Sequence, residues 1–226
     1  MRVVIVNPNT TQAVTDLLVR EARAVAGPGV EVFGITADAG VAAIDSLEDA
    51  EAAGAGVVDK FVGASNADVG VIGGFVDPGL AAARIRLPYP VTAIGEASML
   101  TACLHARHFG VLTVGRSTAS LIEAIIDAYG LRARVSAVQA IDGKLSEVIH
   151  DQRSYDDRFI TAANELIGVT GAGAIVLGGA MFVGMSSRIA SRIPVPLIDP
   201  MRAAMLQAQV LLRLRADKTQ GSGDSM

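Results

Sequence analysis

The chain contains the same succession of strand, turn and helix motifs twice, and this internal repeat constrains its fold more than any other feature. Residues 2–11 (RVVIVNPNTT) are an apolar strand, a turn and a polar cluster that opens a helix. Residues 109–118 (FGVLTVGRST) have the same order of apolar strand, turn and hydroxyl pair, again followed by helix-forming residues. A single match of this kind carries little weight, because apolar strands resemble one another.

Two further pairs of segments extend the repeat along the chain. Residues 68–75 (DVGVIGGF) and residues 173–180 (GAIVLGGA) are apolar strands with Gly-Gly at the end, and residues 89–94 and 193–198 each precede a helix. The second copies begin 107, 105 and 104 residues after the first. Three matches in one order at a nearly constant spacing predict a duplicated chain.

Alternation of strands and helices in each copy predicts an α/β fold. Continuous Val/Ile/Leu runs are typical of mostly parallel sheets that are covered on both faces. We expect two similar half-domains, a first lobe of residues 1–95 with 200–215 and a second lobe of residues 96–199. The Gly/Ser/Asp-rich end, residues 216–226, predicts a disordered tail. Because ligands of such sheets bind beyond the carboxyl ends of the strands, the site should lie in the cleft between the lobes.

Charge and composition exclude several classes of partner. With a net charge of -4 and 4% aromatic residues, the chain offers neither a basic stripe nor base-stacking platforms, which argues against nucleic acid.

The one cysteine, Cys103, cannot form an internal disulfide, and no secretory signal is visible, so we expect a cytoplasmic location. Residues 166–187 carry no charge but are rich in glycine, which favours a buried strand with loops over a membrane span. The 51% apolar content suggests a homo-oligomer.

Glycines and small polar residues follow the predicted strands, where a ligand would bind. Glycine lets a ligand approach the backbone, and the first amides of a following helix attract anions. The chain has no Walker loop, no dinucleotide-binding glycine motif and no nucleophile elbow, so no nucleotide cofactor is expected. His105 and His108 should face solvent, and His150 lies in a charged run without metal-ligand spacing, so we expect no metal.

Five segments give the chain a resemblance to a known group of enzymes. They are residues 6–11 (VNPNTT), 75–80 (FVDPGL), 95–97 (GEA), 174–180 (AIVLGGA) and 194–200 (PVPLIDP). With these segments the sequence resembles the aspartate/glutamate racemase superfamily, and within it most closely the hydantoin and allantoin racemases. The segments are spread over nearly the whole chain.

The resemblance implies a two-base mechanism without a cofactor, in which two cysteines face each other across the substrate. One thiolate would remove the proton on carbon, and the other thiol would return a proton from the opposite face. The family's two cysteine positions fall on Gly74 and Gly179 in this chain. Glycine cannot carry a proton on a side chain, so the usual thiol mechanism is excluded, although the backbone amides of the site remain.

Two carboxylates are candidates for the missing acid and base. Asp77 stands three residues after Gly74, but it also precedes Pro78, which is the pattern of a helix N-cap. Glu96 is expected at a strand end, where burial in the cleft would raise its pKa, or else in a structural hydrogen bond. Asp199 precedes Pro200 and should cap the last helix.

The remaining candidate residues would bind the substrate, although several could instead cap helices. They are Asn7, Thr10, Gly74, Phe75, Val76, Thr113, Ser117, Thr118, Gly179, Ala180 and Met181. The leading hypothesis is a hydantoin-racemase-like enzyme that acts on a small carbonyl or carboxylate compound, such as a cyclic ureide or imide. The proton at carbon would then move through Glu96, Asp77 or a water molecule. The alternatives are a decarboxylase, lyase or hydrolase that uses the same amides, and a non-catalytic binder of small molecules.

Overall fold

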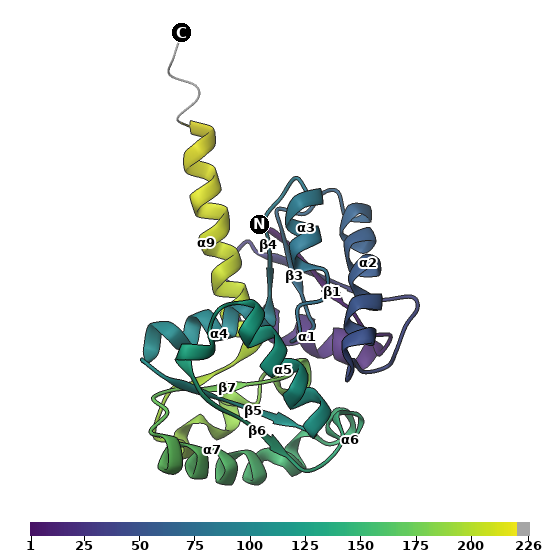
Figure 1. Ribbon diagram of the computed structural model, residues 1–226. Coiled ribbons are helices and arrows are strands. Elements are labelled where there is room, and N and C mark those ends of the chain that lie inside the picture. The colour runs from purple at the N-terminus through teal and green to yellow at the C-terminus, as the bar shows by residue number, and fades with distance from the viewer. Residues whose placement is uncertain (221–226) are drawn as a thin grey trace.

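The first half of the molecule is a parallel sheet with helices on both faces (Figure 1). The structure, a computed structural model, describes residues 1–220. The strands lie in the order β2-β1-β3-β4 and are all parallel. The elements of this half are β1 (Arg2–Asn7), α1 (Gln12–Val25), β2 (Glu31–Thr36), α2 (Leu47–Gly63), β3 (Val69–Ile72), α3 (Leu80–Arg86), β4 (Val91–Ala93) and α4 (Ile94–His105).

The second half repeats this arrangement. Its strands lie in the order β6-β5-β7-β8, again parallel, so each strand takes the place of its counterpart in the first half. The elements are β5 (Phe109–Val114), α5 (Arg116–Ala128), η1 (Arg132–Arg134), β6 (Val135–Ile141), α6 (Leu145–His150), η2 (Gln152–Tyr155), α7 (Asp156–Thr170), β7 (Ile175–Leu177), η3 (Ala180–Phe182), α8 (Ser186–Ile189), η4 (Ala190–Arg192), β8 (Leu197–Ile198) and α9 (Pro200–Gln220). The predicted α/β fold with two similar halves is confirmed.

The last helix of each half packs across the boundary between the halves. Helix α9 follows β8 in the chain but lies against α1, β3, β4 and α4, whereas α4 also contacts β7 and β8 of the second half. In Figure 1, α9 extends from this junction past the first half. The helix continues through Gln220, so residues 216–220 are helical rather than disordered as predicted, and residues 221–226 lie outside the described residues.

The core has three parts, because each buried strand presents side chains to both faces of its sheet. A central cluster joins the two sheets and includes Ile5 and Val71 from the first half and Val111 and Val176 from the second. Separate clusters fill the outer face of each sheet. Within residues 166–187, β7 is completely buried, as predicted, and no helix in the described part of the chain is both long and apolar enough to cross a membrane.

Candidate active site

A small cavity lies between the halves, where the loops after their strands meet. Its volume is about 50 Å³. It is lined by Pro8, Asn9, Ile44, Gly74, Phe75, Val76, Thr118, Leu145, Gly179, Ala180 and Met181. The two glycines predicted to face each other, Gly74 and Gly179, therefore border the same cavity. Five further predicted residues line it as well, namely Phe75, Val76, Thr118, Ala180 and Met181.

Unpaired backbone amides border the cavity from both halves. In the loop after β3, the amide of Asp77 donates to the carbonyl oxygen of Gly74 (3.0 Å) and closes a turn. The N–H groups of residues 74–76, which we call the first cradle, have no acceptor within residues 1–220. The N–H groups of Ala180 and Met181, the second cradle, open η3 and are likewise unpaired in the described structure. Unpaired backbone amides in a turn or at the start of a helix bind carbonyl oxygens or anions.

Two polar side chains add to the hydrogen-bonding capacity of the cavity. The side-chain oxygen of Asn9 accepts from the side-chain amide of Asn7 (3.0 Å) and from the backbone amide of Thr11 (2.9 Å). Its own NH₂ group has no acceptor among the described residues and is available to a ligand. Thr118 is only 5% exposed, and its hydroxyl also makes no hydrogen bond inside the described structure.

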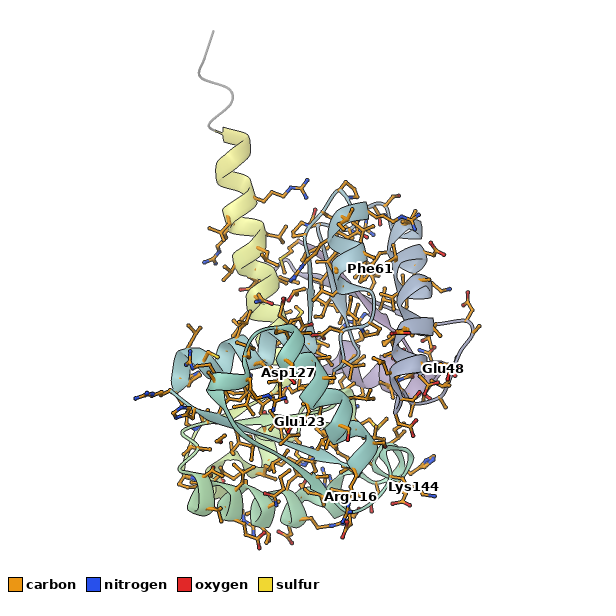
Figure 2. The ribbon with its side chains drawn as sticks, in the orientation of Figure 1. Glu48, Phe61, Arg116, Glu123, Asp127 and Lys144 are labelled. Atoms are coloured by element: carbon orange, nitrogen blue, oxygen red, sulfur yellow. The ribbon has the colours of Figure 1, made fainter. Side chains whose placement is uncertain are left out.

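The lining carries no ionisable side chain in the part of the chain that the structure describes. Two cations lie within two residues of lining residues in the sequence, but Arg116 and Lys144 are both exposed, and Figure 2 shows them at the outer surface of the second half. Residues 1–220 also contain no group of three or more His, Cys, Asp or Glu side chains that could hold a metal ion. The cavity is therefore uncharged and rich in hydrogen-bond donors.

Neighbouring side chains already occupy the space that a thiol would need. A Cβ atom added at Gly74 would lie 2.5 Å from Cγ of Pro8, and one at Gly179 would lie 2.6 Å from Cε2 of Phe182. Carbon atoms in contact are separated by about 3.5–4.0 Å. A cysteine at either position would therefore require the proline or phenylalanine ring to move.

The structure places Asp77 behind the first cradle rather than on the cavity wall. Its carboxylate accepts from the backbone amides of Gly95 (2.9 Å) and Glu96 (2.6 Å) and from the hydroxyl of Tyr129 (2.7 Å). Burial raises the pKa of Asp77 to about 7, although the three hydrogen bonds act in the opposite direction. The predicted capping of its own helix is wrong: the N-cap of α3 is Gly79, and Asp77 instead binds the first turn of α4.

Glu96 also lies away from the cavity. Strand β4 ends at Ala93, so Glu96 lies in the first turn of α4 and not at a strand end as predicted. Its two carboxylate oxygens accept from the guanidinium of Arg84, which also donates to the carbonyl oxygen of Val91. The structural alternative for Glu96, a hydrogen-bonded pair, matches this geometry.

Four predicted substrate-binding residues do not border the cavity. The buried side-chain amide of Asn7 donates to Asn9, to the carbonyl oxygen of Thr11 and to the hydroxyl of Thr15. The hydroxyl of Thr10 donates to the carbonyl of Val41, that of Thr113 donates to the carbonyl of Gly178, and Ser117 is exposed. Three of these residues thus shape the strand ends, because their polar groups are bonded to the loops that surround the cavity.

Other residues of the site carry no clear signal in the sequence. Pro8 and Asn9 lie in the quoted 6–11 segment, but Ile44 comes from a loop without periodicity, Leu145 is the first residue of the short helix α6, and Tyr129 follows the last residue of α5 in the other half. Asp199 accepts from the amides of Met201 (3.1 Å) and Arg202 (3.2 Å), which confirms that it caps the last helix. His105 and His108 are exposed, as predicted, whereas Cys103 is half-buried.

Two equivalent parallel sheets with a donor-lined cavity at their facing strand ends define a two-lobed α/β protein of the amino-acid and hydantoin racemase type. The chain belongs to the Asp/Glu/Hydantoin racemase family, whose family model matches residues 3–208. The resemblance inferred from the sequence is therefore confirmed. Family membership also indicates a small-molecule substrate.

Curated relatives and solved structures agree with this assignment. The chain is 27% identical over 216 residues to a hydantoin racemase of Pseudomonas sp. (strain NS671), a match that covers 95% of this chain and 87% of the relative. A hydantoin racemase of Paenarthrobacter aurescens is 26% identical, with 95% and 92% covered. The structure of an allantoin racemase from Klebsiella pneumoniae superposes with a TM-score of 0.90 at 30% identity, covering 95% of this chain and 89% of that one. These relatives support a racemase function.

Proposed function

We propose that this chain is an enzyme that exchanges the proton on a carbon atom next to a carbonyl group in a small neutral cyclic ureide, such as a 5-substituted hydantoin. The observation that carries the proposal is the pair of unpaired amide cradles, residues 74–76 and residues 180–181, on one uncharged cavity. Its relatives include hydantoin and allantoin racemases, which supports the same class of substrate.

The donors of the cavity suit the chemistry of a hydantoin ring. The ring presents two carbonyl oxygens on either side of one N–H group, so each cradle can donate to one oxygen. The Thr118 hydroxyl, which has no bonding partner in the described structure, can accept from the ring N–H. When the proton leaves carbon, negative charge develops on the neighbouring carbonyl oxygen, and amides already aimed at that oxygen stabilise the resulting enolate.

A water molecule is the proton carrier in this proposal. Both thiol positions are glycine, and neither Asp77 nor Glu96 lines the cavity, so no side chain of the described lining can act as a base. The present volume of about 50 Å³ has room for water but is small beside typical ligand pockets. Ile44, on a loop of the first half, and Leu145, at the start of α6 in the second half, must therefore move outward to admit the ring.

The uncharged lining also favours a second candidate, a binding protein that retains the pocket without catalysis. A ligand would be held by the same amides and returned unchanged. The two candidates make the same prediction for binding and opposite predictions for the proton on carbon.

The test follows (S)-5-methylhydantoin in deuterated buffer by proton NMR and circular dichroism, with and without protein. Loss of the C5–H signal together with loss of optical activity, faster than in buffer alone, supports the proposal. Binding without exchange supports the second candidate, and ring opening or another new product indicates a lyase or hydrolase. Absence of both binding and reaction contradicts the proposal.

A matched pair of variants tests whether the activity belongs to this cavity. Thr118→Val removes the hydroxyl in the cavity with little change in shape and should lower the exchange rate. Ser117→Ala removes the hydroxyl of the exposed neighbouring residue and should leave the rate unchanged. If the two variants exchange the proton on carbon at the same rate, the reaction takes place outside this cavity.

A further inference from the structure

The turn that carries the first cradle has a backbone conformation that its neighbours must hold in place. Asp77, whose amide closes the turn, has a φ of 51° and is the one non-glycine residue with positive φ within residues 1–220. Asp tolerates this left-handed region better than most residues, but the conformation persists only where surrounding contacts determine it. The contacts that do so lie on the side of the turn away from the cavity.

The carboxylate of Asp77 supplies those contacts. Ala93 is the N-cap of α4 and has no side-chain acceptor, so the first amides of that helix need a partner from elsewhere. The carboxylate of Asp77 accepts from the amides of Gly95 and Glu96, at 2.9 and 2.6 Å. The turn is thereby attached to the start of α4.

Close packing shows that the turn lies directly on the helix. A Cβ atom added at Gly95 would overlap the carbonyl oxygen of Phe75 and would lie 2.8 Å from a carboxylate oxygen of Asp77. Phe75 belongs to the first cradle, so even a methyl group at residue 95 would displace the amides that face the cavity.

Tyr129 connects the same carboxylate to the second half. It follows α5, and its hydroxyl donates to Asp77 at 2.7 Å, with no other partner in the described residues. The charged and titratable groups around Asp77 are Glu96 of α4, Arg84 of α3 and Tyr129 itself. Glu96 and Arg84 neutralise each other as an ion pair, so among residues 1–220 Tyr129 contributes the one direct side-chain hydrogen bond to Asp77.

We propose that Asp77 and Tyr129 are positioning residues of the site: their hydrogen bond aligns the amides of residues 74–76 with the facing amides of Ala180 and Met181. This inference depends on the proposed function for its ligand, but not for its structural content. Asp77 touches no ligand in this arrangement. It acts through the turn that precedes it, and Tyr129 transmits the position of α5 to that turn.

Two tyrosine variants test the proposal by equilibrium binding of (S)-5-methylhydantoin. Tyr129→Phe removes only the hydroxyl and should weaken binding about tenfold, the cost of one hydrogen bond to a charged group. Tyr89→Phe is the matched control, because the Tyr89 hydroxyl, like that of Tyr129, donates one hydrogen bond of 2.7 Å, here to the carbonyl of Phe61. We expect the control to bind like the wild type. Wild-type affinity in Tyr129→Phe would overturn the proposal.

Two measurements on the free protein keep the inference separate from the proposed function. Amide hydrogen exchange of Gly73 and Asp77, the hydrogen-bonded amides on either side of the first cradle, should be faster in Tyr129→Phe than in the wild type and in Tyr89→Phe. In ¹H–¹⁵N spectra of the wild type, the chemical shifts of the Gly95 and Glu96 amides should follow the protonation of Asp77 with a midpoint near pH 7. In Asp77→Asn this change should be absent. If the wild type does not bind the hydantoin, the proposed function fails alone. If the exchange of the Gly73 and Asp77 amides is unchanged in Tyr129→Phe, the positioning role is wrong whatever the ligand.

Discussion

The two halves of the molecule hold their cradle loops by carboxylates that lie on opposite sides of the same junction. In the first half, Asp77 lies in the loop after β3 and reaches to the amides that open α4. In the second half, Asp199 lies at the start of α9 and reaches back to the loop after β7, where it accepts from the amide of Gly184 (2.6 Å) and the hydroxyl of Ser186 (3.2 Å). Both halves thus join a loop after a strand to the start of a helix. The carboxylate that makes the connection comes from the loop in the first half and from the start of the helix in the second.

This difference makes the first loop dependent on contacts between the halves. Asp199 caps its own helix and binds a loop of its own half, so its contacts are local. Asp77 receives a hydroxyl from Tyr129, which belongs to the second half. In both copies of the duplicated fold the first amides of the helix need an acceptor, but a different residue supplies it in each copy. The first cradle should consequently be the more sensitive of the two to changes elsewhere.

The largest expected effect comes from removing each carboxylate in turn. Asp77→Ala leaves the amides of Gly95 and Glu96 and the Tyr129 hydroxyl without an acceptor, and it places alanine at a φ of 51°, so we expect a loss of about 3–5 kcal/mol in the free energy of unfolding. Asp199→Ala removes a helix cap and the acceptor of Gly184 and Ser186, but it involves no positive φ, so it should cost less, about 2–3 kcal/mol. Urea denaturation of both variants measures the difference. Equal losses would show that the two junctions are equivalent after all.

Introducing cysteines at Gly74 and Gly179 should cost less stability than removing Asp77, but it should also distinguish the two halves. Gly74→Cys and Gly179→Cys each introduce a Cβ atom within 2.6 Å of a ring carbon, so both should lower stability by about 1–3 kcal/mol. Gly74→Cys should be the worse of the two, because the Pro8 ring has no side-chain rotation with which to withdraw.

Thermal unfolding of the two cysteine variants provides the measurement. Pro8→Ala combined with Gly74→Cys should recover part of the loss, since alanine vacates the place of the proline Cγ atom. No recovery in the double variant would contradict a steric origin.

Asp77 should also give the protein a pH-dependent stability near neutrality. Because its pKa is about 7 in the folded protein and 3.8 in the unfolded chain, the folded state binds the proton more tightly, and stability falls as the pH rises towards 7. Lowering the pH from 8 to 6 should therefore raise the free energy of unfolding by about 1.4 kcal/mol.

The matched variants assign this pH effect to one half. Asp77→Asn should lose the increase between pH 8 and 6, as measured by denaturation at each pH. Asp199→Asn should keep most of it, although burial raises the pKa of Asp199 in the same direction. An unchanged increase in Asp77→Asn would assign the titration to another group.

The sequence predicted the parts of this structure that depend on repeated, local patterns. Offsets of 104–107 residues between equivalent strands placed Gly74 and Gly179 at corresponding strand ends, and the cavity contains both. The Asp-Pro pattern predicted the cap at Asp199 correctly, because there the acceptor and its amides are adjacent in the chain. The same pattern failed at Asp77, whose partners lie 18, 19 and 52 residues away. Local capping signals carry no information about such distant partners.

The smallest expected effect on stability concerns two threonines of the second half with opposite surroundings. The hydroxyl of Thr113 is buried and donates to the carbonyl of Gly178 (2.7 Å), whereas that of Thr118 has no partner in the described structure. Thr113→Val should therefore cost about 1 kcal/mol of stability, while Thr118→Val should change it by less than about 0.5 kcal/mol. Chemical denaturation separates the two. A large loss in Thr118→Val would mean that its hydroxyl serves the fold and is not free for a ligand, because only a hydroxyl without a protein partner can be removed at so little cost.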